Sequence, residues 1–311
     1  MDENKWLNKW IKPITLDNNI YNKINSGNYY IETFTTGAWT VIKELLLAYY
    51  GPSYLMIMRK QKWIKKLCYV DLFAGSGIIK LTGLKNYYLG SPLIVKYAID
   101  GNFDNYYFFE QKNTNVNQLK TLVQDDHSSV YQGDSNVEIG NIISALSKTG
   151  VHSLIFIDPY AMEVKFDTIR KLSDISCDII INVAVEEIKR AIMQFRALHN
   201  NTTALDTFFG DEKWKNELPE NPDDEKIFDY YSNKIVEEAR KKTPIKTAVY
   251  KTLDGHHYYL LFTATAGHGT QPKFFNIVKS FNEATQNLDG NKIMNFIKHN
   301  IEHDDSIDKF L

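Results

Sequence analysis

The segment 70–77 (VDLFAGSG) holds the first residues whose types and spacing could do chemistry. It ends an apolar stretch and then turns through small residues. Two glycines separated by one residue allow positive φ and a close backbone approach to a ligand. A carboxylate at Asp71 suits the positive groups of S-adenosylmethionine (SAM) and would repel a pyrophosphate. The sequence therefore predicts contacts between SAM and Asp71, Phe73, Ala74, Gly75 and Gly77; the alternative is a tight turn without a ligand.

Two further acids follow apolar stretches. Glu110 is placed to accept hydrogen bonds from both hydroxyls of a ribose. It lies farther from the glycines than the usual spacing of about 20 residues, which we attribute to an insertion at 78–90. Asp134, with Ser135, is placed to bind the adenine amino group. The alternatives are a solvated strand end for Glu110 and a helix N-cap for Asp134 or Ser135.

Residues 156–161 (FIDPYA) follow the most apolar stretch of the chain. The sequence resembles the Asp/Asn-Pro-Pro-Tyr/Phe loop of amino-methyltransferases, with one proline absent. In that loop the acid and the following carbonyl accept hydrogen bonds from a substrate NH2, and the aromatic ring stacks on the base. Methyl transfer depends mostly on in-line positioning. We predict Asp158, Pro159 and Tyr160 as catalytic residues; a role for Asp158 at the cofactor only, or in the structure only, is the alternative.

The elements that must position these residues follow from a regular alternation. Helical patterns at 91–100, 114–124, 136–148 and 164–173 separate apolar stretches at 67–73, 106–109, 129–131, 153–157 and 178–183. Alternating strands and helices predict a parallel sheet. Two later strands, 245–252 and 257–265, flank an Asp-Gly pair that is typical of a hairpin. The predicted fold class is α/β: a class I methyltransferase Rossmann-like sheet of five parallel strands plus a closing antiparallel hairpin.

The whole chain is predicted to divide into three parts. We expect an N-terminal arm and helices over 1–64, a Rossmann-like domain over 65–265 with a helical insertion at about 184–243, and C-terminal helices with an acidic tail over 266–311. Residues 37–62 are predicted to be helical, with a break or kink at Gly51-Pro52 before a second helix. The second helix ends in a basic segment at 59–66 around Trp63, which is either a solvated helix end or a nucleic-acid contact. Its cations are Arg59, Lys60, Lys62, Lys65 and Lys66.

Composition excludes several classes of protein. The net charge of −2 over 311 residues argues against indiscriminate binding of nucleic acid through phosphates. Cys68 and Cys177 show no metal spacing and fit buried thiols in a reducing compartment. No apolar run approaches the about 20 residues of a membrane span, and the polar N-terminus does not resemble a signal peptide. We expect a cytoplasmic protein without a metal site.

The motifs taken in order resemble the three-Cys-motif partner protein family. The resemblance covers roughly residues 30–265 and rests on Lys43, the pairs at 45–46 (LL) and 49–50 (YY), and the motifs YVDLFAGSG, GSPL at 90–93, FFE at 108–110, GDSN and FIDPYA. It implies a methyltransferase-like fold, cofactor residues at Asp71, Gly75, Gly77, Glu110 and Asp134, and a substrate loop at 158–160. It also implies a partner, a separate three-cysteine protein of radical-enzyme type. Ala161 departs from the glycine that commonly follows the aromatic residue, so the loop is less tightly bent.

These observations predict a SAM-dependent methyltransferase that acts on a nitrogen of a nucleic-acid base. Two alternatives stay open. One is a methyltransferase of small molecules or peptides, which the slight acidity of the chain favours. The other is a catalytically silent scaffold for the three-cysteine partner. The presence of all four acids argues against it: Asp71, Glu110, Asp134 and Asp158.

Overall fold

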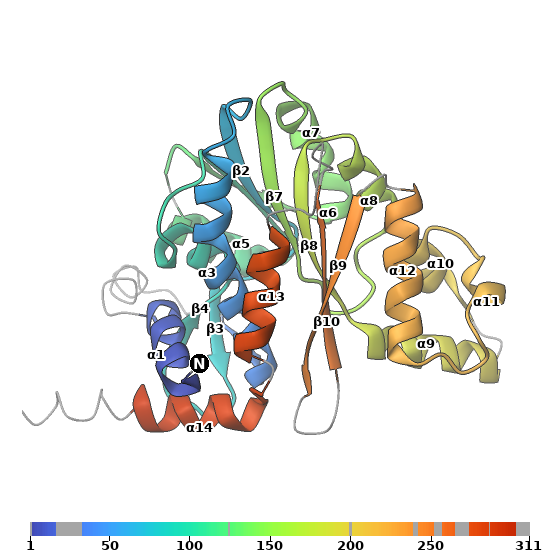
Figure 1. The fold of residues 1–311 in the computed structure, drawn as a ribbon. Helices are drawn as coiled ribbons and strands as arrows, with labels where there is room; N and C mark the ends of the chain where they lie inside the picture. The colour runs from blue at the N-terminus through green and yellow to red at the C-terminus, as the bar shows by residue number, and fades with distance from the viewer. Residues whose placement is uncertain are drawn as a thin grey trace, which may run out of the picture.

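A seven-stranded sheet forms the centre of the molecule (Figure 1). The computed structural model describes residues 2–16, 33–123, 125–198, 201–238, 242–251, 257–264, 274–285 and 287–302. The strand order is β6-β5-β2-β7-β8-β10-β9. The strands are β2 (Lys66–Asp71), β5 (Asn105–Glu110), β6 (Ser128–Gln132), β7 (Val151–Ile157), β8 (Cys177–Val183), β9 (Lys242–Lys251) and β10 (His257–Ala264).

The pairing confirms the predicted fold class. The first five strands of this sheet run parallel, and β10 runs antiparallel to both β8 and β9. A dinucleotide-binding fold would place a parallel strand there, whereas the reversed last strand is typical of class I methyltransferases. The predicted turn of the hairpin at 253–256 and the acidic tail lie outside the described residues.

The central strands separate two hydrophobic cores. Every residue of β7 and β8 is buried, as expected for strands that are covered on both faces. Side chains alternate between the cores along a strand. Leu154 and Phe156 of β7 face one core, and Ile155 and Ile157 face the other.

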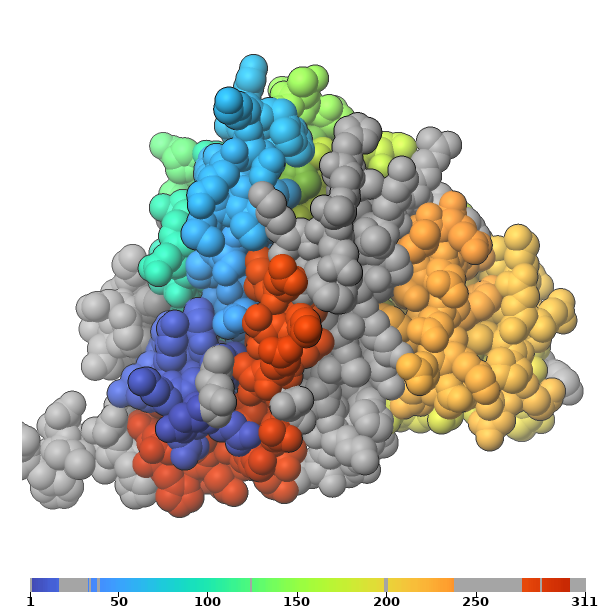
Figure 2. All heavy atoms as spheres, viewed as in Figure 1, coloured from blue at the N-terminus to red at the C-terminus, as the bar shows by residue number. Residues whose placement is uncertain are grey.

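Helices from both ends of the chain cover the first core. α3 (Ala38–Met58) lies on the sheet, and α1 (Glu3–Ile11), α13 (Phe274–Thr285) and α14 (Gly290–Asn300) surround it. Figure 2 shows the four helices side by side on one face. A short 3₁₀ helix, Lys12–Ile14, follows α1.

Helices that follow β6, β7 and β8 cover the second core. Among the described residues, four of these helices lie between β8 and β9 in the sequence. The helices on this side are α6 (Ser135–Glu138), α7 (Gly140–Leu146), α8 (Phe166–Ser173), α9 (Val185–Leu198), α10 (Thr203–Phe209), α11 (Trp214–Glu217) and α12 (Asp224–Glu238). No helix among the described residues is long and apolar enough to span a membrane.

The predicted break before a second helix is wrong, because a single helix, α3, runs through Pro52; the alternative of a kink stays a prediction. Its neighbours Tyr50, Tyr54 and Leu55 are buried in the first core, and this packing offsets the hydrogen bond that proline cannot donate. A side chain at Gly51 would lie 3.0 Å from Ile99 Cδ1, so the glycine allows a close approach. The helix ends at Met58, and most of the basic segment is therefore not helical.

The insertion predicted at 78–90 is a β-hairpin. β3 (Ile78–Leu81) and β4 (Tyr87–Leu89) form a three-stranded sheet with β1 (Phe34–Thr36). The Gly90 N–H donates to the Gly77 carbonyl at 2.8 Å and closes the hairpin at its base. The next helix, α4 (Ser91–Leu93), therefore begins beside the glycines. It continues as a π-helix, Ile94–Ala98, two residues short of the predicted end.

Candidate functional site

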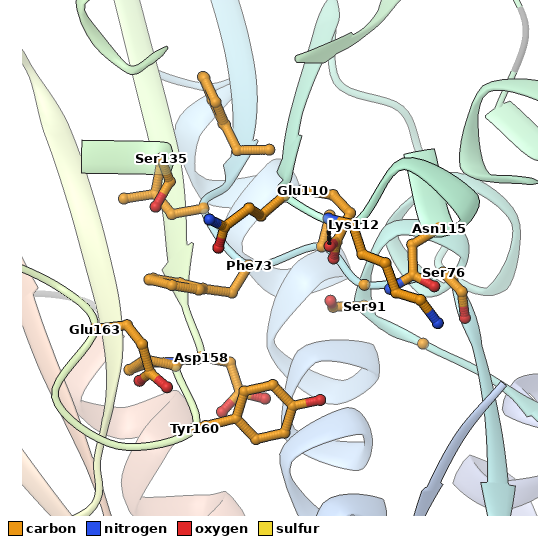
Figure 3. Close-up of a pocket in the computed structure, with 18 of the residues that line it drawn as sticks. Phe73, Ser76, Ser91, Glu110, Lys112, Asn115, Ser135, Asp158, Tyr160 and Glu163 are labelled. Carbon is orange, nitrogen blue, oxygen red and sulfur yellow. Dashed lines mark hydrogen bonds between the residues drawn. The ribbon is translucent and has the colours of Figure 1, made fainter. Parts of the chain in front are cut away.

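A cavity of about 900 Å³ lies at the carboxyl ends of β2, β5, β6 and β7 (Figure 3). Open α/β sheets bind their ligands at this edge. The cavity collects nearly all residues that the sequence predicts for a site. Its lining includes Phe73, Ala74, Gly75, Gly77, Glu110, Asp134, Ser135, Asp158, Pro159 and Tyr160.

Asp71 is the predicted site residue that does not line the cavity. It is fully buried at the end of β2. Its carboxyl accepts hydrogen bonds from Ser91 Oγ at 2.6 Å, the Phe73 N–H at 3.2 Å and Tyr69 Oη at 3.3 Å. Burial raises its pKa to about 7, although these hydrogen bonds oppose the shift. The predicted direct contact with a cofactor is therefore corrected: Asp71 lies behind the wall and holds Ser91 and the turn in place.

The glycine turn, residues 75–77, has the backbone that the sequence indicates. Gly75 has φ of 62° and Gly77 has φ of 82°, a region that other residues rarely adopt. A side chain at Gly77 would also lie 3.2 Å from Leu119 Cδ1. Both positions therefore need glycine, and the turn presents backbone rather than side chains to the cavity.

Glu110 and Asp134 lie at the ends of β5 and β6. Glu110 accepts a hydrogen bond from the Lys112 N–H at 2.6 Å, at the entrance to α5 (Asn113–Val123). Asp134 is the N-cap of α6 and accepts from the Asn136 N–H at 2.9 Å. Burial tends to raise the pKa of Asp134, but the bonds from Asn136 and the proximity of Lys165 lower it overall. The N-cap alternative is thus correct, and it leaves Asp134 beside the cavity.

Asp158 is held by two residues that the sequence analysis did not predict as site residues, although Lys43 is part of the family resemblance. Lys43 Nζ of α3 donates to both carboxylate oxygens, at 2.7 and 2.6 Å. Asn182 Nδ2 of β8 donates to Oδ1 at 2.8 Å. Both partners line the cavity and are largely buried. The Asp158 side chain is only 17% exposed, so three hydrogen bonds fix it at the cavity wall.

Glu44, the neighbour of Lys43, is a second acid on α3 that the sequence analysis missed. It lines the cavity and is 5% exposed. Burial, and then the proximity of Asp158, raise its pKa well above the ordinary value. A signal was present in the sequence: Lys43 and Glu44 interrupt an otherwise apolar run over 41–47, and buried charges need partners.

Tyr160 stands at the mouth of the cavity with 72% of its surface exposed. Figure 3 shows its ring next to Asp158. Partial burial and then the carboxylates of Glu110 and Glu163 raise the pKa of its hydroxyl. The Ala161 N–H donates to Glu163 Oε2 at 2.6 Å, which fixes the loop at the position that departs from the family pattern. Three carboxylates, those of Glu110, Glu163 and Asp158, therefore lie near the exposed ring, together with the cation of Lys112.

The basic segment lies away from the cavity. It precedes β2 and so lies at the amino ends of the parallel strands, opposite the cavity. Arg59 pairs with Asp104 at 2.8 Å, and Trp63 packs edge-on against His152. The cations that line the cavity, among the residues that the structure describes, are Lys43, Lys112 and Lys165. No cluster of the described residues could hold a metal ion.

Comparisons with known proteins do not name a family. The sequence matches no family model and no curated protein, so the resemblance to the three-Cys-motif partner proteins stays a prediction. Protein LPL1258 from Legionella pneumophila is similar with a TM-score of 0.47 and 15% identity, over 80% of this chain and 92% of that one.

Two methyltransferase structures are similar at lower scores. A putative O-methyltransferase from Klebsiella pneumoniae has a TM-score of 0.40 and 9% identity, over 80% of this chain and 89% of that one. The O-methyltransferase TomG from Streptomyces achromogenes, involved in tomaymycin synthesis and solved with SAM, has a TM-score of 0.38 and 10% identity. That match covers 86% of this chain and 100% of TomG. The fold described above rests on strand order and on the reversed β10.

Proposed function

We propose that this protein is a SAM-dependent methyltransferase that methylates an amino nitrogen of a nucleic-acid base. One observation carries the proposal. A single cavity at the carboxyl edge of a methyltransferase-like sheet contains the glycine turn, Glu110, Asp134 and Asp158. Each of these lies at the end of a different parallel strand, β2, β5, β6 or β7, as the predicted roles require.

The residues around the cavity fit SAM better than a phosphate-bearing cofactor. Among the described residues, neither Glu44 in the cavity wall nor Asp71 behind it forms an ion pair. Burial raises the pKa of Glu44, and Lys43 partly opposes this rise but donates to both oxygens of Asp158. Such a wall favours a positively charged ligand. Glu110 is placed for the ribose, Asp134 and Ser135 for the adenine, and the glycine turn for the methionyl part. SAM would supply an electrophilic methyl group in this cavity.

Asp158 is suited to orient the acceptor. A carboxylate offers about four lone-pair sites, and Lys43 and Asn182 occupy three of them. The remaining site can accept one N–H of an acceptor amine. The exposed ring of Tyr160 is placed to stack on a planar base, a contact of about 1–3 kcal/mol per base. In the reaction the nitrogen forms a bond to the methyl carbon, the sulfur–methyl bond breaks, and the amine proton leaves to solvent.

A second candidate is a small molecule or a peptide as acceptor. The observation that favours it is the acidic mouth of the cavity, where Glu110 and Glu163 lie near Tyr160. These carboxylates would repel the phosphates that flank a nucleic-acid base. The basic segment cannot compensate at the mouth, since it lies at the opposite edge of the sheet.

The test is calorimetric titration with SAM, S-adenosylhomocysteine and NAD, followed by transfer assays with labelled SAM. The acceptors are RNA, DNA, metabolite extract and peptides, with Asp158→Asn as the inactive control. Binding of the first two ligands and labelling of RNA or DNA support the proposal. Labelling of metabolites or peptides alone supports the second candidate. Absence of binding refutes both and favours a scaffold for the three-cysteine partner, to be sought by co-purification.

A further inference from the structure

Glu44 has one carboxyl oxygen without a partner in the wall of the cavity. The side chain comes from the middle of α3 and is 5% exposed. Its Oε2 atom is buried and receives no hydrogen bond from the part of the chain that the structure describes. Buried polar groups are almost always hydrogen-bonded, and an unpaired carboxylate is costly. The unpaired Oε2 atom therefore indicates that a hydrogen-bond donor of a ligand binds here.

Ser91 joins Glu44 to Asp71 at the beginning of α4. Its backbone N–H is hydrogen-bonded to Glu44, and its hydroxyl donates to Asp71 at 2.6 Å. The adjacent Gly90 is bonded to Gly77 of the glycine turn. Ser91 thus links two buried carboxyls, Glu44 in the wall of the cavity and Asp71 behind it at the end of β2.

Among the described residues, the charged groups near Glu44 form no ion pair with it. Lys43 precedes it on α3, but its ammonium group donates to both oxygens of Asp158. Burial has the largest effect on the pKa of Glu44 and raises it; the proximity of Asp158 and of Asp71 raises it further, whereas the proximity of Lys43 lowers it. The nearby Tyr69 hydroxyl is directed at Asp71. A cation that enters from the cavity would therefore find an unpaired acceptor.

We propose that Glu44 binds the α-ammonium group at the methionyl end of SAM. The inference rests on the proposed function and extends it to a residue outside all the sequence motifs. The order of the strands supports it. With adenine at β6 and ribose at β5, the amino-acid end extends past β2 toward α4 and α3, where Glu44 lies. An alkylammonium group offers three donors, of which one satisfies Glu44 Oε2.

Binding of three ligands to Glu44→Gln tests this role. The amide keeps the size of the side chain and an acceptor for Ser91, but it removes the charge. SAM and S-adenosylhomocysteine carry the ammonium group, whereas methylthioadenosine is the same nucleoside without the amino-acid part. By calorimetry we expect Glu44→Gln to bind the first two about ten- to hundredfold more weakly, the range of a hydrogen bond to a charged group. Methylthioadenosine should bind within about twofold of wild type.

Asp178→Asn is the matched control. Asp178 is also a buried acid, 7% exposed, but it lies near the amino end of β8 beside His152 and does not line the cavity. This variant should bind all three ligands as wild type does. Equal binding of SAM by wild type and Glu44→Gln would overturn the role of Glu44 alone. An equal loss for methylthioadenosine would also overturn it, because the cavity as a whole would then be damaged.

A second measurement serves if Glu44→Gln does not fold. Titration of wild type in buffers of different ionisation enthalpy counts the protons released on binding. An ammonium group next to Glu44 lowers the pKa of that carboxyl, so S-adenosylhomocysteine should release protons and methylthioadenosine should not. Equal release by the two ligands would overturn the proposal. Failure of wild type to bind any of the three would instead refute the proposed function itself.

Discussion

The ion pair between Lys43 and Asp158 allows a prediction with a magnitude. Lys43→Met removes the ammonium group but keeps a long apolar side chain. The two side chains are 11% and 17% exposed, so water compensates little of the loss. Removing one partner of a buried pair costs about 3–5 kcal/mol. Because Asn182 still donates to Asp158 at 2.8 Å, we expect the lower end, a loss of about 3 kcal/mol in the free energy of unfolding.

Urea unfolding of four proteins measures this effect. They are wild type, Lys43→Met, Asp158→Asn and the double variant, and their unfolding free energies form a thermodynamic cycle. We expect the double variant to be more stable than the sum of the single losses implies, by about 2 kcal/mol, because the second change removes the group that the first left unpaired.

The control for this cycle is Lys165→Met. Lys165 also lines the cavity, but its contact with Asp134 is 3.5 Å long and both side chains are more than 40% exposed. Exposed pairs contribute about 0–1 kcal/mol, so this variant should lose little stability. Single losses at Lys43 and Asp158 that add within about 0.5 kcal/mol would refute the reasoning, since independent sites are additive to that extent.

Three further predictions concern the acids. Asp158→Asn should bind SAM within a few-fold of wild type in calorimetry and abolish methyl transfer; an equal loss of both would contradict the catalytic role. Glu110→Ala should weaken SAM binding by about 1.5–3 kcal/mol, and an unchanged affinity would mean that the ribose lies elsewhere. Burial raises the pKa of Asp71 to about 7, so the folded state holds a proton that the unfolded state releases near pH 4. Wild type should therefore lose stability between about pH 4 and pH 7 relative to Asp71→Asn, by up to about 4 kcal/mol; parallel pH profiles in urea unfolding would exclude this shift.

The sequence predicts the sheet well because burial on both faces leaves a strong pattern. The apolar run at 153–157 corresponds to the last five residues of β7, all of them buried. The Asp-Gly pair and the two strands beside it indicate the reversal that separates this sheet from a dinucleotide-binding fold. Parallel strands bring their carboxyl ends to one edge, which is why motifs far apart in the chain were expected to meet.

The errors arise where tertiary packing overrides local signals. Gly51-Pro52 is a strong break signal, yet α3 continues because its flanks are buried in the first core. The sequence indicates the hairpin of β3 and β4 only as extra chain length between the glycines and Glu110, because its strands are short. Lys43 and Glu44 are not predicted as site residues, because charges in an apolar run indicate burial but not which part of the fold the helix face contacts. Only its packing on the sheet brings them to Asp158 and Ser91.

The charges around the cavity determine which ligands it accepts. Lys43 pairs with Asp158, whereas burial raises the pKa of Glu44 well above its ordinary value and that of Asp71 to about 7. A pyrophosphate beside the glycine turn would meet Glu44 in the wall, with Asp71 behind it, while the ammonium group of Lys43 is engaged with Asp158. A sulfonium with an ammonium group would instead lower the pKa of both acids and gain charge-assisted hydrogen bonds. The same reasoning predicts that SAM binds more tightly as the pH rises toward about 7, because fewer protons must then be displaced while the α-ammonium group of the ligand stays charged, and that Glu44→Gln reduces this dependence.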